Sequence, residues 1–306
     1  MEHDGRLESK SGKQSIMRPA EYRLGLVFVT ASAVAWSTAG LFTRLISLNS
    51  STMLVWRGIF GALGIAVVIL AMERRSALLG FRNLDWQGWL FAALGALGMI
   101  FFITSLRHTT VAHVAVIYAT VPFLAAALSW LVMRERPSSS AVVASLVALA
   151  GVVVMVGFGA EGGLAGDLLA FGMTAAMALI MVIARRFHEI PVMPAACLSA
   201  LLSGLACWPI GNPLAVTGNE LLLLMLFGVV NSALGLALFT LGARLLPAIE
   251  TALIGSLDAP LAPLWVWLVF NETPGASTMI GGAIVFIAVA AHLIAGASQT
   301  ARSSTQ

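Results

Sequence analysis

Long apolar runs constrain the fold of this chain more than any other feature of its sequence. A helix of about 20 apolar residues crosses the roughly 30 Å hydrocarbon core of a bilayer. Ten such runs follow one another, and the loops between them are too short to hold a folded domain. Membrane-spanning strands would alternate apolar and polar residues, which these runs do not. We therefore expect an all-α integral membrane protein with ten transmembrane helices. The predicted spans are residues 24–46, 53–72, 86–106, 111–133, 141–158, 164–184, 192–210, 221–241, 248–270 and 276–296.

The composition excludes several other classes of protein. Hydrophobic residues make up 59% of the chain and charged residues only 10%, whereas a soluble domain carries about 25% charged residues. A disordered chain would need low hydrophobicity and high charge. The two cysteines both lie within 192–210, so they provide neither a disulfide framework nor a zinc cage. No metal or other cofactor is predicted.

Basic residues indicate the orientation, because cytoplasmic loops carry an excess of Lys and Arg. If the N-terminus is cytoplasmic, fourteen basic residues fall on the cytoplasmic side and three on the other, namely Arg44, Arg57 and Arg107. Both tails, residues 1–23 and 297–306, are therefore expected in the cytoplasm. The basic charge reflects this bias and does not indicate a nucleic-acid surface.

An internal repeat divides the chain into two halves, residues 24–158 and 164–296. A shift of 137 positions aligns Arg107 with Arg244, Glu135 with Glu272 and Pro137 with Pro274. Chance agreement is the alternative, but shared Arg, Glu and Pro residues at one shift disfavour it. Each half has five spans, an odd number, so the second half enters the membrane from the opposite side. We expect two inverted five-helix repeats around a central cavity, the architecture of secondary transporters.

Prolines lie near the middle of two equivalent predicted spans. Pro122 lies in 111–133, and Pro260 and Pro263 lie in 248–270. A proline removes a helix hydrogen bond and bends the axis, which frees carbonyl groups at mid-depth. These residues are candidates for a kink or a gate, and a purely structural kink is the alternative.

Three motifs make the chain resemble the drug/metabolite transporter superfamily, in particular its ten-helix EamA branch. They are Ala35-Trp36-Ser37-Thr38, the stretch from Pro122 to Glu135-Arg136-Pro137-Ser138, and the stretch from Pro260 to Asn271-Glu272. Within the branch, Ile254-Gly255-Ser256 resembles the bacterial aromatic amino-acid exporters of the YddG type. The resemblance implies export of amino acids or similar metabolites across a bacterial inner (plasma) membrane, without an ATP-binding domain.

Asp258 is the only acidic residue at mid-depth of a predicted span. A carboxylate there costs roughly 3 kcal/mol on insertion scales, so we expect it to face a cavity or a partner. It could bind a substrate amino group, or couple transport to protons, because a low dielectric favours the neutral form. A structural carboxyl group that is hydrogen-bonded between helices is the alternative.

Other residues suited to a substrate site lie at similar depth. Mid-depth aromatic rings can stack on an apolar substrate, flexible thioethers suit a permissive pocket, and a few hydroxyl and amide groups would supply polarity. Helix packing is the alternative for each of them. The candidates are Trp36, Ser37, Tyr118, Met177, Asn231 and Ser256, in addition to Asp258. His113, at the start of a span, is interpreted as a hydrogen-bonded helix-end residue.

The most consistent interpretation is a secondary transporter that exports amino acids, including aromatic or other neutral ones, by alternating access. Export of another metabolite or a drug-like solute, or a channel-like pore, are the alternatives. A channel would normally show a polar stripe or charged ring. An enzyme would need an embedded constellation of catalytic residues and an ATP-driven pump a phosphate loop, and the chain has neither motif. The expected partners are a small-molecule substrate and membrane lipid, with no ATPase subunit and a monomer as the simplest assembly.

Overall fold

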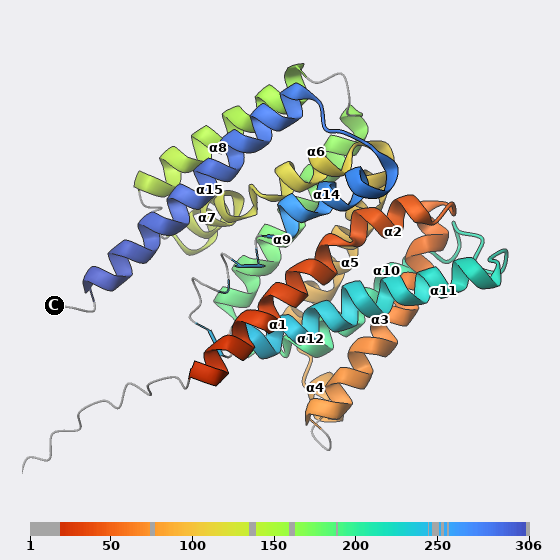
Figure 1. Cartoon of the computed structure of the whole chain (residues 1–306). Coiled ribbons are helices and arrows are strands. Elements are labelled where there is room, and N and C mark those ends of the chain that lie inside the picture. Colours follow the sequence, from red (N-terminus) through yellow and green to blue (C-terminus); the bar gives the residue numbers. More distant parts are fainter. Residues whose placement is uncertain are drawn as a thin grey trace, which may run out of the picture.

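The structure is a computed structural model, and it is built of helices throughout the part that it describes (Figure 1). It describes residues 19–73, 77–134, 139–158, 163–187, 189–243, 245–246, 251, 254–255 and 257–303. The helices of the first half are α1 (Pro19–Ser37), α2 (Ala39–Leu45), α3 (Ser50–Glu73), α4 (Ala77–Arg82), α5 (Trp86–His108), α6 (Val111–Tyr118), α7 (Val121–Met133) and α8 (Ser139–Phe158). Those of the second half are α9 (Leu164–Arg186), α10 (Val192–Cys207), α11 (Gly218–Phe227), the π-helix η2 (Gly228–Leu234), α12 (Gly235–Ala243), α14 (Asp258–Phe270) and α15 (Ala276–Ser303).

The predicted all-helical fold is confirmed, and several predicted spans are divided. The first is broken at Thr38 between α1 and α2, and the fourth is bent by 41° between α6 and α7. The eighth contains η2, and most of the first half of the ninth lies outside the described residues. By length and apolarity, five described helices can cross a membrane, or six with the bent pair counted as one. The count of ten spans therefore stays a prediction.

Backbone geometry follows the internal repeat. The 137-residue shift maps both ends of α7 onto the ends of α14, and the start of α8 onto the start of α15. Arg134 and Asn271, which end α7 and α14, are also equivalent, and they are the two non-glycine residues with positive φ in the described chain (56° and 55°). A residue in the left-handed backbone conformation commonly ends a helix. Because it recurs here at equivalent positions, the two halves share the same local structure at this helix end.

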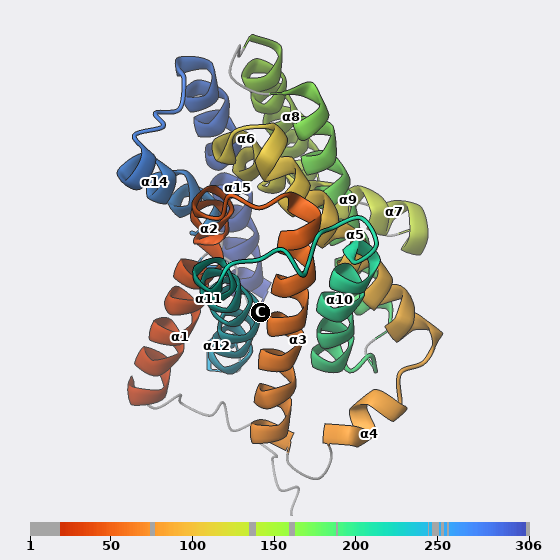
Figure 2. The ribbon, with the colours of Figure 1, turned by 90° about the vertical axis from the view of Figure 1, so that its right-hand side faces the viewer.

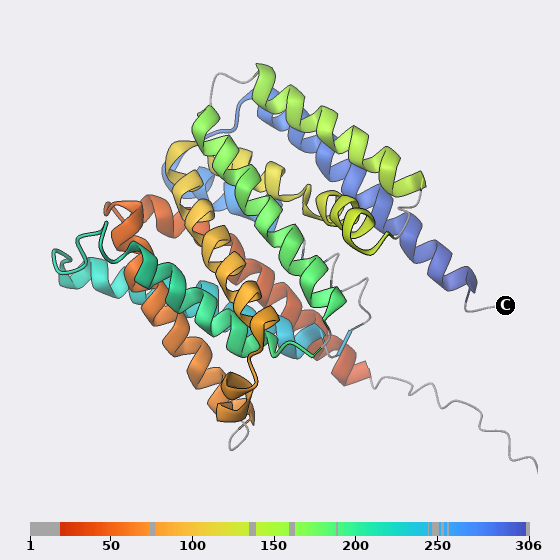
Figure 3. The ribbon, with the colours of Figure 1, turned by 180° about the vertical axis from the view of Figure 1, so that it is seen from behind.

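The contacts between helices follow the internal repeat as well. Helix α5 packs on α9, and the equivalent pairing is that of α12 with α1. Helix α3 packs on its own counterpart α10, and α8 packs along α15 at the periphery. Figure 2 shows α3 between α12 and α10, and Figure 3 shows α9 beside α5, with the α8–α15 pair at the edge. The two halves are therefore intertwined, and every helix at the centre contacts the other half.

Two contacts between helix ends agree with a chain that crosses the membrane in alternating directions. Arg44, at the end of α2, forms a 3.5 Å ion pair with Glu272, which follows α14. Both ends are predicted to lie on the outer side of the membrane. Trp86 and Phe187, predicted on the cytoplasmic side, have ring centroids 5.8 Å apart. Ends that share a predicted side therefore lie together, and which side faces the cytoplasm stays a prediction.

Candidate functional site

A cavity of about 380 Å³ lies between the two halves. Helices α1, α2, α3, α5 and α6 of the first half line it together with α9, α10, η2, α12 and α14 of the second, whereas α8 and α15 contribute no lining residue in the part of the chain that is described. The lining of α5 runs from Phe91 to Leu106, a rise of about 22 Å along the helix axis. This volume lies in the range of small-molecule sites.

The structure brings together six of the seven substrate-site candidates from the sequence. Trp36, Ser37, Tyr118, Met177, Asn231 and Asp258 all line this cavity. The seventh, Ser256, lies outside the described residues. These six come from five different helical segments, so their grouping is a property of the tertiary fold and not of neighbourhood in the sequence. Their role in binding a substrate stays a prediction.

Two of these candidates are held by aromatic neighbours. The ring of Trp36 lies against that of Phe239, with centroids 5.1 Å apart. The hydroxyl group of Ser37 accepts a 2.8 Å hydrogen bond from the indole N–H of Trp265 and donates one of 2.7 Å to the carbonyl of Val34. The hydroxyl is thus part of a link between α1 and α14 at the cavity wall.

Two of the three prolines lie at helix starts and not in helix middles. Pro122 is the second residue of α7 and Pro260 is the third residue of α14, whereas Pro263 lies inside α14. Proline is tolerated at a helix start, because the N–H that it lacks has no partner there. The expected kink in the fourth span is therefore a break between two helices, beside Tyr118, and α14 starts at Asp258. Whether these breaks act as a gate stays a prediction.

Arg57 is the main correction to the sequence analysis, which counted it among the residues of the outer side. The structure places it within α3, only 2% exposed and lining the cavity. An arginine four residues inside the predicted span 53–72 was the available signal, because a charged residue within a span marks a functional site by default. In the count of basic residues on each side of the membrane, Arg57 stood only as a charge of the outer side, and its position within a span was overlooked.

Asn231 holds the guanidinium group of Arg57. Its Oδ1 atom accepts a 2.6 Å hydrogen bond from Nη2 of Arg57, and its Nδ2 group donates to the backbone carbonyls of Ala35 and Trp36 at 3.3 and 3.0 Å. Asn231 lies within η2, and π-helical turns inside α-helices are frequent at functional sites. Nothing in the apolar pattern of 221–241 distinguished this turn from regular α-helix.

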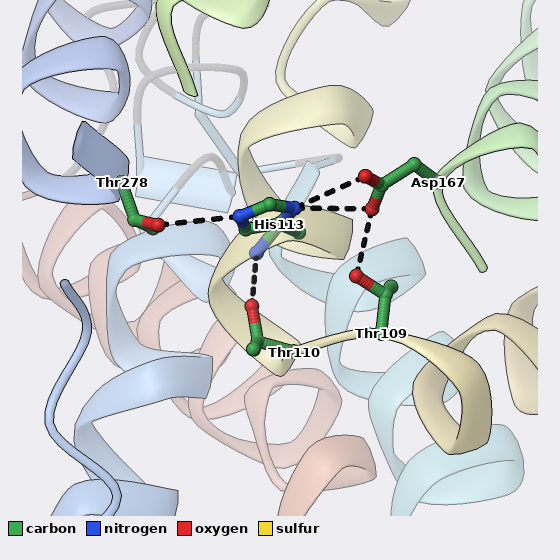
Figure 4. Close-up of polar contacts among 5 residues, drawn as sticks. All are labelled: Thr109, Thr110, His113, Asp167 and Thr278. Atoms are coloured by element: carbon green, nitrogen blue, oxygen red, sulfur yellow. Dashed lines mark hydrogen bonds and ion pairs between the residues drawn. The ribbon is translucent and has the colours of Figure 1, made fainter. Parts of the chain in front are cut away.

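A second buried polar cluster joins the halves near one end of the cavity (Figure 4). His113 is 0% exposed, and its Nδ1 atom lies 3.1 Å from Oδ1 of Asp167 in α9. Its Nε2 atom lies 3.2 Å from the hydroxyl of Thr278 in α15, and Thr109 donates a 2.7 Å hydrogen bond to Asp167. His113 is hydrogen-bonded at a helix start, as the sequence analysis expected. Its partner Asp167 was missed because it lies in the first turn of its helix, where a carboxylate is ordinarily solvated.

A helical membrane protein with two repeated halves around a central cavity has the build of a small-molecule transporter. The chain belongs to the EamA-like transporter family of the drug/metabolite transporter superfamily, whose family model matches residues 23–157 and 164–294. It is a transporter and not an enzyme. It is similar to the "Uncharacterized transporter YwfM" of Bacillus subtilis (strain 168), with 26% identity over 271 residues, 85% of this chain and 90% of that protein. A crystal structure with 21% identity has the same fold, with a TM-score of 0.62 over 87% of this chain and 95% of that one.

Proposed function

We propose that this transporter exports amino acids, above all those with aromatic or other neutral side chains, from the cytoplasm by alternating access. The observation that carries the proposal is the cavity between the halves, because most of its wall is apolar and a few polar groups stand among these side chains. Such a wall suits an apolar side chain joined to a small polar group better than it suits sugars or polyanions, which need many hydrogen-bond partners.

Each candidate residue has a role in this proposal. The rings of Trp36 and Tyr118 stack on the substrate side chain, and the flexible thioether of Met177 adapts to its shape. The carboxylate of Asp258 binds the substrate ammonium group. Ser37, Asn231 and Ser256 supply the remaining polarity, although both ends of the Asn231 amide already have protein partners.

Alternating access requires the two halves to separate at one end of the cavity while they stay closed at the other. The breaks before α7 and α14, with Pro122, Pro260 and Pro263, are the proposed hinges of the gate. We place the protein in a bacterial inner membrane, with the cytoplasmic tails 1–23 and 297–306 and the repeats 24–158 and 164–296 as its parts. In this orientation the His113 cluster closes the outer end.

Counterflow in proteoliposomes tests the function. Vesicles loaded with unlabelled L-phenylalanine should transiently accumulate labelled L-phenylalanine, with saturable kinetics, because a carrier exchanges substrate across its two states. A channel-like pore would equilibrate without counterflow. If no amino acid shows counterflow, the proposal is wrong, and counterflow of a different metabolite would identify the alternative exporter.

A matched pair of tryptophan variants tests the site. Trp36→Ala should raise the KM for L-phenylalanine up to about tenfold, because it removes a stacking partner. Trp89→Ala is the control, because Trp89 lies on α5 but is 50% exposed and is not a lining residue of the cavity. Equal effects of the two substitutions would contradict the placement of the site.

A further inference from the structure

Arg57 is a buried cation whose charge no described carboxylate balances. Its side chain lines the cavity and is 2% exposed. Its Nε atom is buried without a hydrogen-bond partner, and neither ion pair among the described residues includes it. An uncompensated charge at this depth is costly, whereas a guanidinium group that meets an anion there recovers much of that cost.

The surroundings of Arg57 orient the guanidinium group without neutralising it. One nitrogen donates to Oδ1 of Asn231, whose amide is itself oriented by the carbonyls of Ala35 and Trp36. The ring of Phe227 lies under the group, with 4.7 Å from Cζ to the ring centroid. Both partners are neutral, so they fix the position of the planar guanidinium group and leave its positive charge available to a ligand.

In the alignment of the two repeats by the 137-residue shift, Pro194 is equivalent to Arg57, and Leu94 is equivalent to Asn231. The polar pair therefore has no counterpart in the other half, although the surrounding helices do. A feature that the repeated architecture required would be expected in both halves. The asymmetry indicates that the pair serves the contents of the cavity.

We propose that Arg57 binds the carboxylate group of the transported solute, through two parallel N–H···O hydrogen bonds of the guanidinium fork. The proposal rests on the proposed function in one respect: the cavity must be the transport site. Asp258 is the other charged residue that lines the described cavity, so the formal charges of the wall sum to zero. An amino acid zwitterion, whose carboxylate meets Arg57 and whose ammonium group meets Asp258, keeps the cavity neutral, whereas a monocarboxylate leaves one excess negative charge. A phosphate dianion would leave excess negative charge beside Asp258.

Three ligands of the same size separate the groups that Arg57 and Asp258 recognise. L-phenylalanine has both charges, 3-phenylpropionate has only the carboxylate, and L-phenylalaninamide has only the ammonium group. Titration calorimetry of the full chain in lipid nanodiscs measures each directly. Wild type should bind the two carboxylates about thirtyfold or more tightly than the amide, because the amide leaves a buried charge unpaired.

Two substitutions at Arg57 test the assignment. Arg57→Gln should abolish the preference for carboxylates over L-phenylalaninamide. Arg57→Lys keeps the charge but not the planar fork, so it should retain part of the preference. A third variant keeps Arg57 itself: Asn231→Asp places a carboxylate where Oδ1 already contacts the guanidinium, so it should lower carboxylate affinity by competition while L-phenylalaninamide still binds.

The outcomes distinguish this proposal from the proposed function. Equal wild-type affinity for L-phenylalanine and its amide, no binding of either carboxylate, or an Asn231→Asp variant with unchanged carboxylate affinity would overturn the role of Arg57. Binding of 3-phenylpropionate that depends on Arg57, together with no counterflow of any amino acid, would support Arg57 and refute amino-acid export. Counterflow of amino acids, together with an Arg57→Gln variant that still prefers carboxylates over L-phenylalaninamide, would support amino-acid export and refute the role of Arg57.

Discussion

The imidazole of His113 and the carboxylate of Asp167 form a buried pair, with 3.1 Å between Nδ1 and Oδ1, that joins the first half of the chain to the second. Thr278 binds the other side of the same ring, so α6, α9 and α15 meet at one point (Figure 4). This point lies on the side predicted to face outward. If the halves separate there during transport, these contacts must break, so the cluster favours the outward-closed state.

The first prediction concerns this closure. Thr278→Val removes one hydrogen bond between helices at nearly constant volume, and it should shift the closed-to-open ratio by roughly threefold to fivefold toward the outward-open state. An impermeant thiol reagent added outside should then label Ala115→Cys, a cavity-lining position, faster in the variant. Native Cys197 and Cys207 are both buried, and they are replaced in the background used for labelling.

Thr174→Val is the matched control for Thr278→Val. Thr174 is also fully buried, but its hydroxyl donates to the carbonyl of Ala170 within its own helix. Its loss breaks no contact between the halves, so the labelling rate should stay at the wild-type value. Equal acceleration by both substitutions would show that general loosening, and not the His113 cluster, controls access.

The second prediction concerns the close approach of α3 and α10. A Cβ atom at Gly58 would lie 2.5 Å from the carbonyl oxygen of Ala200 and 3.0 Å from Cα of Gly204, so both backbones would have to move apart. Gly58→Ala should destabilise the protein by about 2 kcal/mol. Gly218→Ala is the control, because a Cβ there meets nothing within 4 Å. Thermal melting in detergent measures both variants, and equal melting temperatures would contradict the packing described.

The third prediction concerns topology. Ser47 is exposed between α2 and α3, and Glu189 is exposed after α9. An impermeant maleimide added to intact cells should label Ser47→Cys, whereas Glu189→Cys should react only after the membrane is permeabilised. The reason is the concentration of basic residues in the loops predicted to be cytoplasmic. Labelling of both positions from one face would contradict the alternating path of the chain.

Much of the fold could be predicted because membrane insertion and packing depend on properties that are local in the sequence. Apolar length placed α3, α5 and α9 within a few residues of their observed bounds. The shared Glu and Pro residues fixed the shift that maps α7 onto α14. These features depend on the bilayer thickness and on helix termination, which do not require knowledge of distant contacts.

The details of the site were less accessible, because they depend on contacts between distant segments. The partner of Arg57 is 174 residues away in the sequence, and its placement depends on a π-helical turn that no residue pattern in 221–241 distinguishes. Asp167 was missed for the same reason, because burial of its carboxylate follows from α6 and the end of α5 packing over it. Pro122 and Pro260 illustrate a different limit: their presence predicted a disruption of the helix, but not that the disruption would be a new helix start.

The last prediction concerns Asp258 and the energy source of transport. We expect facilitated export, in which an imposed pH gradient does not accelerate efflux from proteoliposomes, because the described lining residues of the cavity include one carboxylate, Asp258, and no histidine. Asp258→Asn keeps the shape of the side chain but cannot exchange a proton, so substrate exchange at equilibrium should persist, with weaker binding of ligands that carry an ammonium group. Asp167→Asn is the companion variant, because the buried His113–Asp167 pair joins the two halves away from Asp258. Proton coupling through Asp258 would instead give gradient-accelerated efflux in wild type and in Asp167→Asn, and none in Asp258→Asn. Acceleration lost only in Asp167→Asn would move the coupling site to the closure between the halves.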